Sequence, residues 1–164
     1  MYTTEIESPI GRLTLASDGT ALTGLWIENQ KYFASTLDSN PEIRSELPVF
    51  HETEVWLNAY FDGSPLPPLP KLAPQGSVFR QNVWNLLLDL SIGETTTYGA
   101  MTKILRERGI SAASQAVGGA VGHNPILILI PCHRVLGSNG SLTGYAGGLD
   151  VKRYLLDLEG ISYK

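Results

Sequence analysis

The chain carries the sequence ILILIPCHRV from Ile126 to Val135, in which its only cysteine follows a run of aliphatic residues. The length and the Ile/Leu content of this run predict a strand buried on both faces. Pro131 would end the pairing of that strand, because proline has no N–H to donate. Cys132 is therefore expected at the rim of the strand, where a reactive side chain can meet a ligand.

Two interpretations of Cys132 follow from this position. Unpaired cysteine is among the most buried residue types, so the first treats Cys132 as an inert hydrophobic side chain. The second treats it as a nucleophile, because a base beside a thiol generates the reactive thiolate. The adjacent His133 favours the second interpretation.

Length and composition narrow the class of protein. The 164 residues, of which 43% are hydrophobic, suit a soluble globular chain of one domain or two small ones. A single cysteine excludes an internal disulfide and a cysteine-rich zinc site, and a free thiol is typical of a reducing cytoplasm. No signal peptide and no apolar segment of the roughly 20 residues needed to span a bilayer is recognisable. We expect a cytoplasmic protein without membrane anchor, cofactor or metal.

The net charge of −4 is unevenly divided along the chain. Residues 1–75 hold 4 basic and 10 acidic side chains, a net −6, whereas residues 76–164 hold 8 and 6, a net +2. This asymmetry is compatible with nucleic-acid binding by the second half, with modest and salt-sensitive affinity. Ordinary scatter of charges is the alternative explanation.

A proline-rich segment at about 62–75 divides the chain and predicts a stiff linker. We assign residues 1–75 to an N-terminal unit that includes this linker, and residues 76–164 to a second domain. In the first half, apolar segments at 11–17 and 24–27 flank Asp18-Gly19 and predict a β-hairpin, and a helix is expected from Val49 to Phe61.

The second half is predicted to be mostly helical. Apolar spacing predicts a helix from Phe79 to Leu90, and a second that enters at residues 95–97 and stops at Gly109. Ser111 offers an N-cap for a short helix over residues 112–122, and a final helix is expected from Leu149 to Glu159. Two helices joined by a glycine turn form the helix-turn-helix pattern, which helical hairpins that bind no nucleic acid share.

The predicted helix over residues 112–122 has one face almost without side chains. Helical spacing places Ala113, Val117, Ala120 and Val121 inside, and Gln115, Gly118, Gly119 and Gly122 outside. Three helical glycines cost roughly 3 kcal/mol relative to alanine, so a close neighbour is indicated. That neighbour is either a packed helix or a DNA groove; with DNA, backbone amides and Ser114 would meet phosphates while Gln115 enters the duplex.

The segment from residue 137 to the C-terminus adds a turn, a glycine-rich loop and an acidic residue. The loop at 143–148 lacks the lysine and threonine of a phosphate-binding loop, so a nucleoside triphosphate site is not expected. Glu159 lies where the helix dipole disfavours a carboxylate. A partner such as His133 would compensate, and simple surface exposure is the alternative.

These residues resemble one known family. Pro131-Cys132-His133-Arg134-Val135, preceded by residues 117–120 and 124–125, closely resembles the O6-alkylguanine-DNA alkyltransferases, single-use DNA repair proteins also called methylated-DNA–protein-cysteine methyltransferases. The resemblance covers nearly all of residues 76–164. It implies an α+β fold, with a small ribonuclease-H-like α/β unit before a mostly helical domain that contains a helix-turn-helix.

The resemblance implies irreversible, stoichiometric transfer of an alkyl group from O6 of guanine in double-stranded DNA to Cys132, with O4 of thymine as a further candidate donor. His133 would act as base through a water, Glu159 would orient the imidazole, and Asn124 would brace the turn before the cysteine. The implied partner is alkylated duplex DNA, bound through its minor groove by a monomer.

The resemblance also implies a set of contacts to the flipped nucleotide. Tyr98 would donate a hydrogen bond to the base, the backbone at Cys132, Val135 and Ala146 would read its edge, and Tyr145 would wall the alkyl pocket. The implied DNA contacts are Ser114, Gln115, Gly118, Gly119 and Arg134. The family usually has arginine where this chain has Gln115, which predicts weaker DNA affinity, because glutamine lacks the charge and the cation–π stacking.

The chemistry agrees with these roles. A free thiol with a pKa of about 8.5 is mostly protonated at neutral pH, so a base is required. The O6 atom lies inside the base stack, so the nucleotide must be flipped out. Two rival functions remain: a lesion-recognition module that performs no transfer, against which Cys132 argues, and a cysteine hydrolase that uses Cys132, His133 and Glu159 on an ester.

Overall fold

The computed structural model describes all 164 residues and divides them into two compact units. The first unit comprises Met1–Gln75 together with Pro125–Leu127, and the second comprises Gly76–Asn124 and Ile128–Lys164. The chain therefore passes from the second unit to the first and back again just before Cys132.

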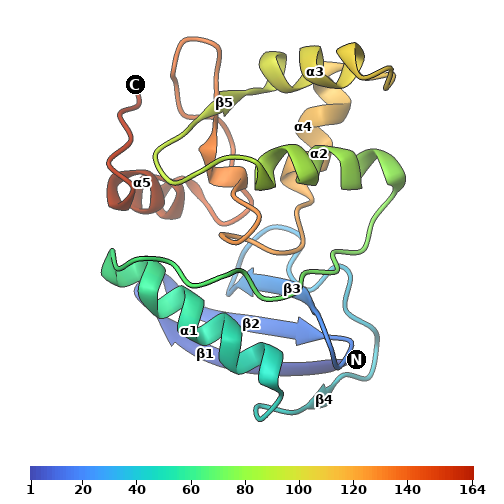
Figure 1. The fold of residues 1–164 in the computed structure, drawn as a ribbon, viewed down its shortest axis with the longest axis vertical. Coiled ribbons are helices and arrows are strands. Elements are labelled where there is room, and N and C mark those ends of the chain that lie inside the picture. Colours follow the sequence, from blue (N-terminus) through green and yellow to red (C-terminus); the bar gives the residue numbers. More distant parts are fainter. The chain divides into compact units, whose positions relative to one another are not determined.

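The first unit is built on a four-stranded sheet in the order β3-β2-β1-β4 (Figure 1). The strands are β1 (Tyr2–Ser8), β2 (Gly11–Ser17), β3 (Leu22–Ile27) and the short β4 (Glu42–Ile43). Neighbours among the first three strands are antiparallel, and β4 is parallel to β1. The predicted hairpin is confirmed as β2–β3. Its turn is closed by Asp18, whose carboxylate accepts the backbone N–H groups of Thr20 and Ala21, each at 2.9 Å.

A single helix, α1 (Pro48–Asp62), lies along this sheet (Figure 1). Its apolar face buries Val49, Phe50, Trp56, Leu57 and Tyr60. Proline in the first turn costs no hydrogen bond, and a left-handed Gly63 closes the C-terminus at φ 70°. The predicted helix over residues 49–61 is confirmed to within one residue at each end.

The proline-rich segment contains no helix and only one point of strand pairing. Leu72 forms a parallel bridge with Leu22, supported by two 2.8 Å backbone hydrogen bonds: Leu22 N–H donates to Lys71, and Ala73 N–H donates to Leu22. Part of this segment is thus fastened to β3.

The second unit contains four helices and a two-stranded parallel pair. The helices are α2 (Val78–Leu88), α3 (Tyr98–Glu107), α4 (Ser114–Gly122) and α5 (Leu149–Leu158), and the pair joins β5 (Thr96–Thr97) to β6 (Val135–Leu136). Thr97 caps α3 as predicted, because its hydroxyl accepts the N–H of Ala100 at 3.0 Å. Buried Trp84 donates its indole N–H to the Ala120 carbonyl at 2.9 Å and so ties α2 to α4. None of the helices in the structure combines the length and the apolar character needed to cross a bilayer.

The strand predicted over residues 126–130 is wrong. Only Ile126 pairs, in a parallel bridge with Leu25, and Ile128 has a left-handed backbone with φ 72°, which interrupts any extended path. All five aliphatic residues are buried, so burial accounts for the composition without strand pairing. The chain then makes a single 3-10 turn, η1 (Cys132–Arg134), and Cys132 is only 3% exposed instead of standing at an open rim.

The predicted start of α4 is also wrong. The helix begins at Ser114, with an extended Ala113 as its N-cap and no side-chain cap, so Ser111 plays no capping role. Arg106 donates its Nε–H to the Ala112 carbonyl at 2.7 Å, which holds the preceding residues as a loop. Ala113 is consequently exposed, whereas the other three predicted inward residues, starting with Val117, are buried.

Candidate active site

The η1 turn places Cys132 beside a bracing amide. Asn124 donates its side-chain N–H to the Ile130 carbonyl at 2.7 Å, and the Cys132 backbone N–H donates to the same carbonyl at 2.8 Å. A further hydrogen bond from Asn124 lowers the pKa of the Cys132 thiol. Asn124 therefore holds both the turn and the sulfur atom.

His133 is locked against Glu159. Its Nε2 lies 2.5 Å from Glu159 Oε2, and both side chains are at most 1% exposed. The other ring nitrogen, Nδ1, is buried and has no protein partner. Burial lowers the pKa of His133, against the raising effect of Glu159, so the neutral ring is favoured. With the proton on Nε2, facing the carboxylate, Nδ1 carries the lone pair and can act as a base.

Arg134 completes the environment of Glu159. Its Nε–H donates to Glu159 Oε1 at 2.7 Å, and its Nη1–H donates to the Leu90 carbonyl at 2.8 Å. The Gly93 N–H adds a bond to the same Oε1 at 3.2 Å. The predicted DNA contact by Arg134 is contradicted, because the residue is 5% exposed and its guanidinium is engaged in this buried ion pair. Arg134 instead donates to the carboxylate and holds it in place against His133.

The thiol of Cys132 is protonated in the unbound protein at neutral pH. Burial raises its pKa to about 11, although the Asn124 hydrogen bond and the positive charge of Lys152 act in the opposite direction. The sulfur therefore requires a proton acceptor before it can act as a nucleophile.

Lys152 is a member of this site that the sequence analysis missed. It is fully buried in α5 and donates from Nζ to the Val135 carbonyl at 2.7 Å, to Thr143 Oγ1 at 3.0 Å and to the Thr143 carbonyl at 3.3 Å. Burial lowers its pKa to about 8. Helical spacing in the sequence could have indicated its burial. Lys152 precedes the buried Leu155 and Leu156 by three and four residues and so shares their apolar face.

The predicted base-binding residues lie around Thr143. Half-buried Tyr98, the first residue of α3, has its hydroxyl 3.1 Å from Thr143 Oγ1. Val135 lies in β6, and its carbonyl is already engaged by Lys152. Tyr145 and Ala146 are partly buried in the loop that follows Thr143, where the Tyr145 carbonyl accepts the Gly148 N–H at 2.9 Å.

The outer face of α4 is open. Ser114, Gln115 and Gly119 are exposed, and a Cβ at Gly119 or Gly122 would meet no atom within 4 Å. At Gly118 a Cβ would only touch the Tyr98 ring at 3.9 Å. A packed neighbouring helix therefore does not explain these glycines, and their backbone is left open on this face.

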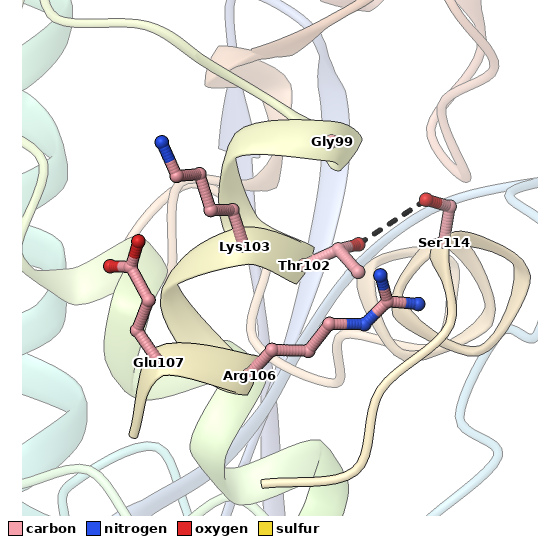
Figure 2. A pocket seen from close by; sticks show the side chains of 6 residues that line it. All are labelled: Gly99, Thr102, Lys103, Arg106, Glu107 and Ser114. Atoms are coloured by element: carbon pink, nitrogen blue, oxygen red, sulfur yellow. Dashed lines mark hydrogen bonds between the residues drawn. The ribbon is translucent and has the colours of Figure 1, made fainter. Parts of the chain in front are cut away.

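A basic cavity of about 490 Å³ adjoins the start of α4. Figure 2 shows it between α3 and Ser114, with the Arg106 guanidinium extending toward Ser114 and the Ser114 hydroxyl 3.4 Å from that of Thr102. Lys103, Glu107 and Gly99 complete its lining. Two cations and the positive end of the uncapped α4 outweigh one carboxylate here, which suits an anion.

Comparison with known proteins gives the same result for both parts of the chain. Residues 78–161 match the model of the "6-O-methylguanine DNA methyltransferase, DNA binding domain", and residues 1–68 match that of its "ribonuclease-like domain". The methylated-DNA–protein-cysteine methyltransferase of Methanosarcina acetivorans is 45% identical over 98% of this chain and 99% of its own length. That of Haemophilus influenzae is 41% identical over 99% of this chain and 88% of its own length.

Comparison with solved structures gives the same result as the comparison of sequences. The Mycobacterium tuberculosis OGT in complex with DNA is 42% identical and superposes with a TM-score of 0.82, over 97% of this chain and 92% of its own. The fold and the site define a DNA-binding protein with a cysteine held for group transfer. The chain belongs to the 6-O-methylguanine DNA methyltransferase family, which confirms the recognition and the α+β fold class predicted from the sequence.

Proposed function

We propose that this protein repairs DNA by moving an alkyl group from O6 of guanine in duplex DNA onto Cys132, once per molecule. The observation that carries the proposal is the state of His133: its Nε2 is bound to Glu159, and its buried Nδ1 has no protein partner. A base of this kind, in the residue next to the only cysteine, supplies what a thiol with a raised pKa needs.

The reaction follows from these groups. The Cys132 proton passes through a bridging water to His133 Nδ1, and Glu159 stabilises the imidazolium that forms. The thiolate attacks the alkyl carbon, a sulfur–carbon bond forms, and the carbon–O6 bond breaks with its electron pair leaving on the purine. Tyr98 donates a hydrogen bond to the purine as that charge develops. The thioether product has no hydrolytic exit, so the protein is consumed.

The flipped base must reach a sulfur atom that is 3% exposed in the unbound protein. We assign its entry to the loop over residues 143–148, which carries Tyr145 and Ala146 and contains three glycines. The base would then lie between this loop and Tyr98, with Tyr145 beside the alkyl group and the Ala146 and Val135 backbone at the purine edge.

DNA is assigned to the open face of α4. The bare backbone at Gly118 and Gly119 suits the minor groove, and Gln115 is exposed for insertion at the gap left by the flipped base. Ser114 and the basic cavity beside it provide a place for a backbone phosphate. We assign this activity to a monomer in the cytoplasm, the compartment that keeps a free thiol reduced.

The proposal is tested by the intact mass of the protein after incubation with a duplex oligonucleotide that contains O6-methylguanine. We expect a gain of one methyl group, located on the peptide with Cys132, and no gain with the unmodified duplex. Binding without an adduct would support the recognition module, and repeated turnover of an ester would support the hydrolase.

Replacing Gly119 with alanine separates folding from DNA binding. Because a Cβ meets nothing there, Gly119→Ala should raise the free energy of unfolding by up to about 1 kcal/mol, the difference in helix propensity. The same methyl group stands on the face assigned to DNA, so binding of duplex DNA should weaken.

Denaturant unfolding and fluorescence anisotropy with a labelled duplex measure the two effects. Asn85→Ala on the exposed side of α2 is the matched control, since it improves helix propensity without touching α4. Equal DNA affinity for Gly119→Ala and this control would contradict the assigned face.

A further inference from the structure

A polar chain runs from the interior of the second unit to Tyr98. Lys152 Nζ lies 3.0 Å from Thr143 Oγ1, which lies 3.1 Å from the Tyr98 hydroxyl. The transfer described above needs neither Lys152 nor Thr143 as a reacting group. Both are nevertheless linked through hydrogen-bonding distances to Tyr98, the residue assigned as donor to the purine.

The direction of the hydrogen bonds in this chain follows from counting protons. An ammonium group only donates, so Thr143 Oγ1 accepts from Lys152 and must place its own proton elsewhere. Two acceptors are within reach, the Tyr98 oxygen at 3.1 Å and the Val135 carbonyl at 3.4 Å. The Val135 carbonyl also accepts from Lys152 at 2.7 Å, and it lies farther from Thr143 Oγ1 than the Tyr98 oxygen does. Donation to Tyr98 therefore gives Thr143 the shorter of its two hydrogen bonds.

This direction leaves the phenolic proton of Tyr98 available to a ligand. If Tyr98 donated to Thr143 instead, a bound purine would meet only an oxygen lone pair. A hydroxyl that accepts a hydrogen bond is also a stronger donor, because bonds in a chain polarise one another. The buried ammonium of Lys152, at the inner end of this series of hydrogen bonds, adds to the polarisation.

We propose that Thr143 is a positioning residue that directs the Tyr98 proton toward the purine, with Lys152 setting the orientation of Thr143. The proposal rests on the proposed function, because it concerns the donor to the leaving purine. When the carbon–O6 bond breaks, the electron pair left on the purine is stabilised by this directed proton.

The test is a double-mutant cycle on the single-turnover rate of methyl transfer from an O6-methylguanine duplex. Thr143→Val keeps the shape of the side chain and removes the hydroxyl, so the rate should fall roughly fivefold to tenfold. Thr143→Ser keeps the hydroxyl and should recover most of that loss. In a Tyr98→Phe background, Thr143→Val should have no further effect, because the proton that it directs is gone.

A merely structural role for Thr143 would give a different result. Thr143→Val would then slow the reaction equally in the unmodified protein and in the Tyr98→Phe background, or Thr143→Ser would be as slow as Thr143→Val, and either outcome overturns the inference. Denaturant unfolding identifies variants that are not folded, and Thr143→Ala replaces Thr143→Val if the latter fails to fold. Absence of any adduct on the unmodified protein would sink the proposed function, whereas normal transfer by Thr143→Val would sink only this inference.

Discussion

Glu159→Gln is expected to slow methyl transfer at least about 100-fold, the usual range for loss of general base catalysis. The carboxylate accepts from His133 Nε2 at 2.5 Å and thereby keeps the lone pair on Nδ1. A glutamine amide can present its N–H₂ group to the ring, which would favour the opposite tautomer. It also cannot stabilise the imidazolium that forms when the Cys132 proton is taken up.

The same substitution should lower the free energy of unfolding by about 3 kcal/mol, since it leaves a buried charge without its partner. Arg134 is 5% exposed, and its Nε–H donates to Glu159 Oε1. The remaining bond from Arg134 to the Leu90 carbonyl involves no negative charge. The expected loss of stability therefore comes from the buried charge of Arg134, which no longer has a negative partner.

A second substitution separates these two effects. Arg134→Met in the Glu159→Gln background removes the unpaired charge, so part of the lost stability should return while the transfer rate stays low. Urea unfolding and single-turnover kinetics measure the two quantities. Recovery of the rate together with stability would mean that Glu159 acts only by holding the fold.

Local patterns in the sequence predicted the helices and the hairpin well. The β2–β3 turn and α1 each have a local cause, namely the Asp18 hydrogen bonds, and the proline and glycine at the two ends of α1. Strand β1 was missed, because Tyr2–Ser8 has little apolar alternation and owes its position to pairing with β2. The run before Pro131 shows the converse error, since burial without regular pairing produces the same composition as a strand.

The site was predicted where chemistry shows in residue type and missed where it depends on packing. Asn124 bonds to the Cys132 thiol, and the pairing of His133 with Glu159 is confirmed. Arg134 was misassigned, because a charged residue in a functional motif was expected to face the ligand. Its actual partner lies 25 residues away in sequence, at the end of α5. Contacts of that range cannot be inferred from spacing.

Lys152→Met is expected to slow transfer roughly tenfold, a factor that corresponds to about 1.4 kcal/mol in the barrier to transfer. The positive charge of Lys152 lowers the pKa of Cys132, so its removal leaves a thiol that is harder to ionise. The variant also removes the donor that orients Thr143. Methionine keeps the length and the apolar stem of the side chain, so the cavity left in α5 is small.

The pH dependence of stability gives this variant a sharper signature. Burial lowers the pKa of Lys152 from 10.5 to about 8, so between these values the unfolded chain binds more protons than the native one, and stability rises with pH. The pKa of Cys132 moves the other way, from 9.0 to about 11, so stability falls with pH between those values. Between pH 8 and 9 the lysine acts alone, and it should add about 1 kcal/mol to the free energy of unfolding.

Three proteins distinguish the two groups in urea unfolding from about pH 7 to about pH 10.5. The unmodified chain should gain stability from pH 8 to 9 and then level off, because the two contributions oppose each other. Lys152→Met should lack the gain and lose stability above pH 9, whereas Cys132→Ser should continue to gain. If Lys152→Met still gains stability between pH 8 and 9, another group causes the gain. Lys152 would then not be the charge that lowers the pKa of Cys132. If the gain in stability between pH 8 and 9 disappears in Lys152→Met, the buried ammonium of Lys152 is its source. The protein then loses stability at neutral pH because it holds this positive charge beside the reacting sulfur.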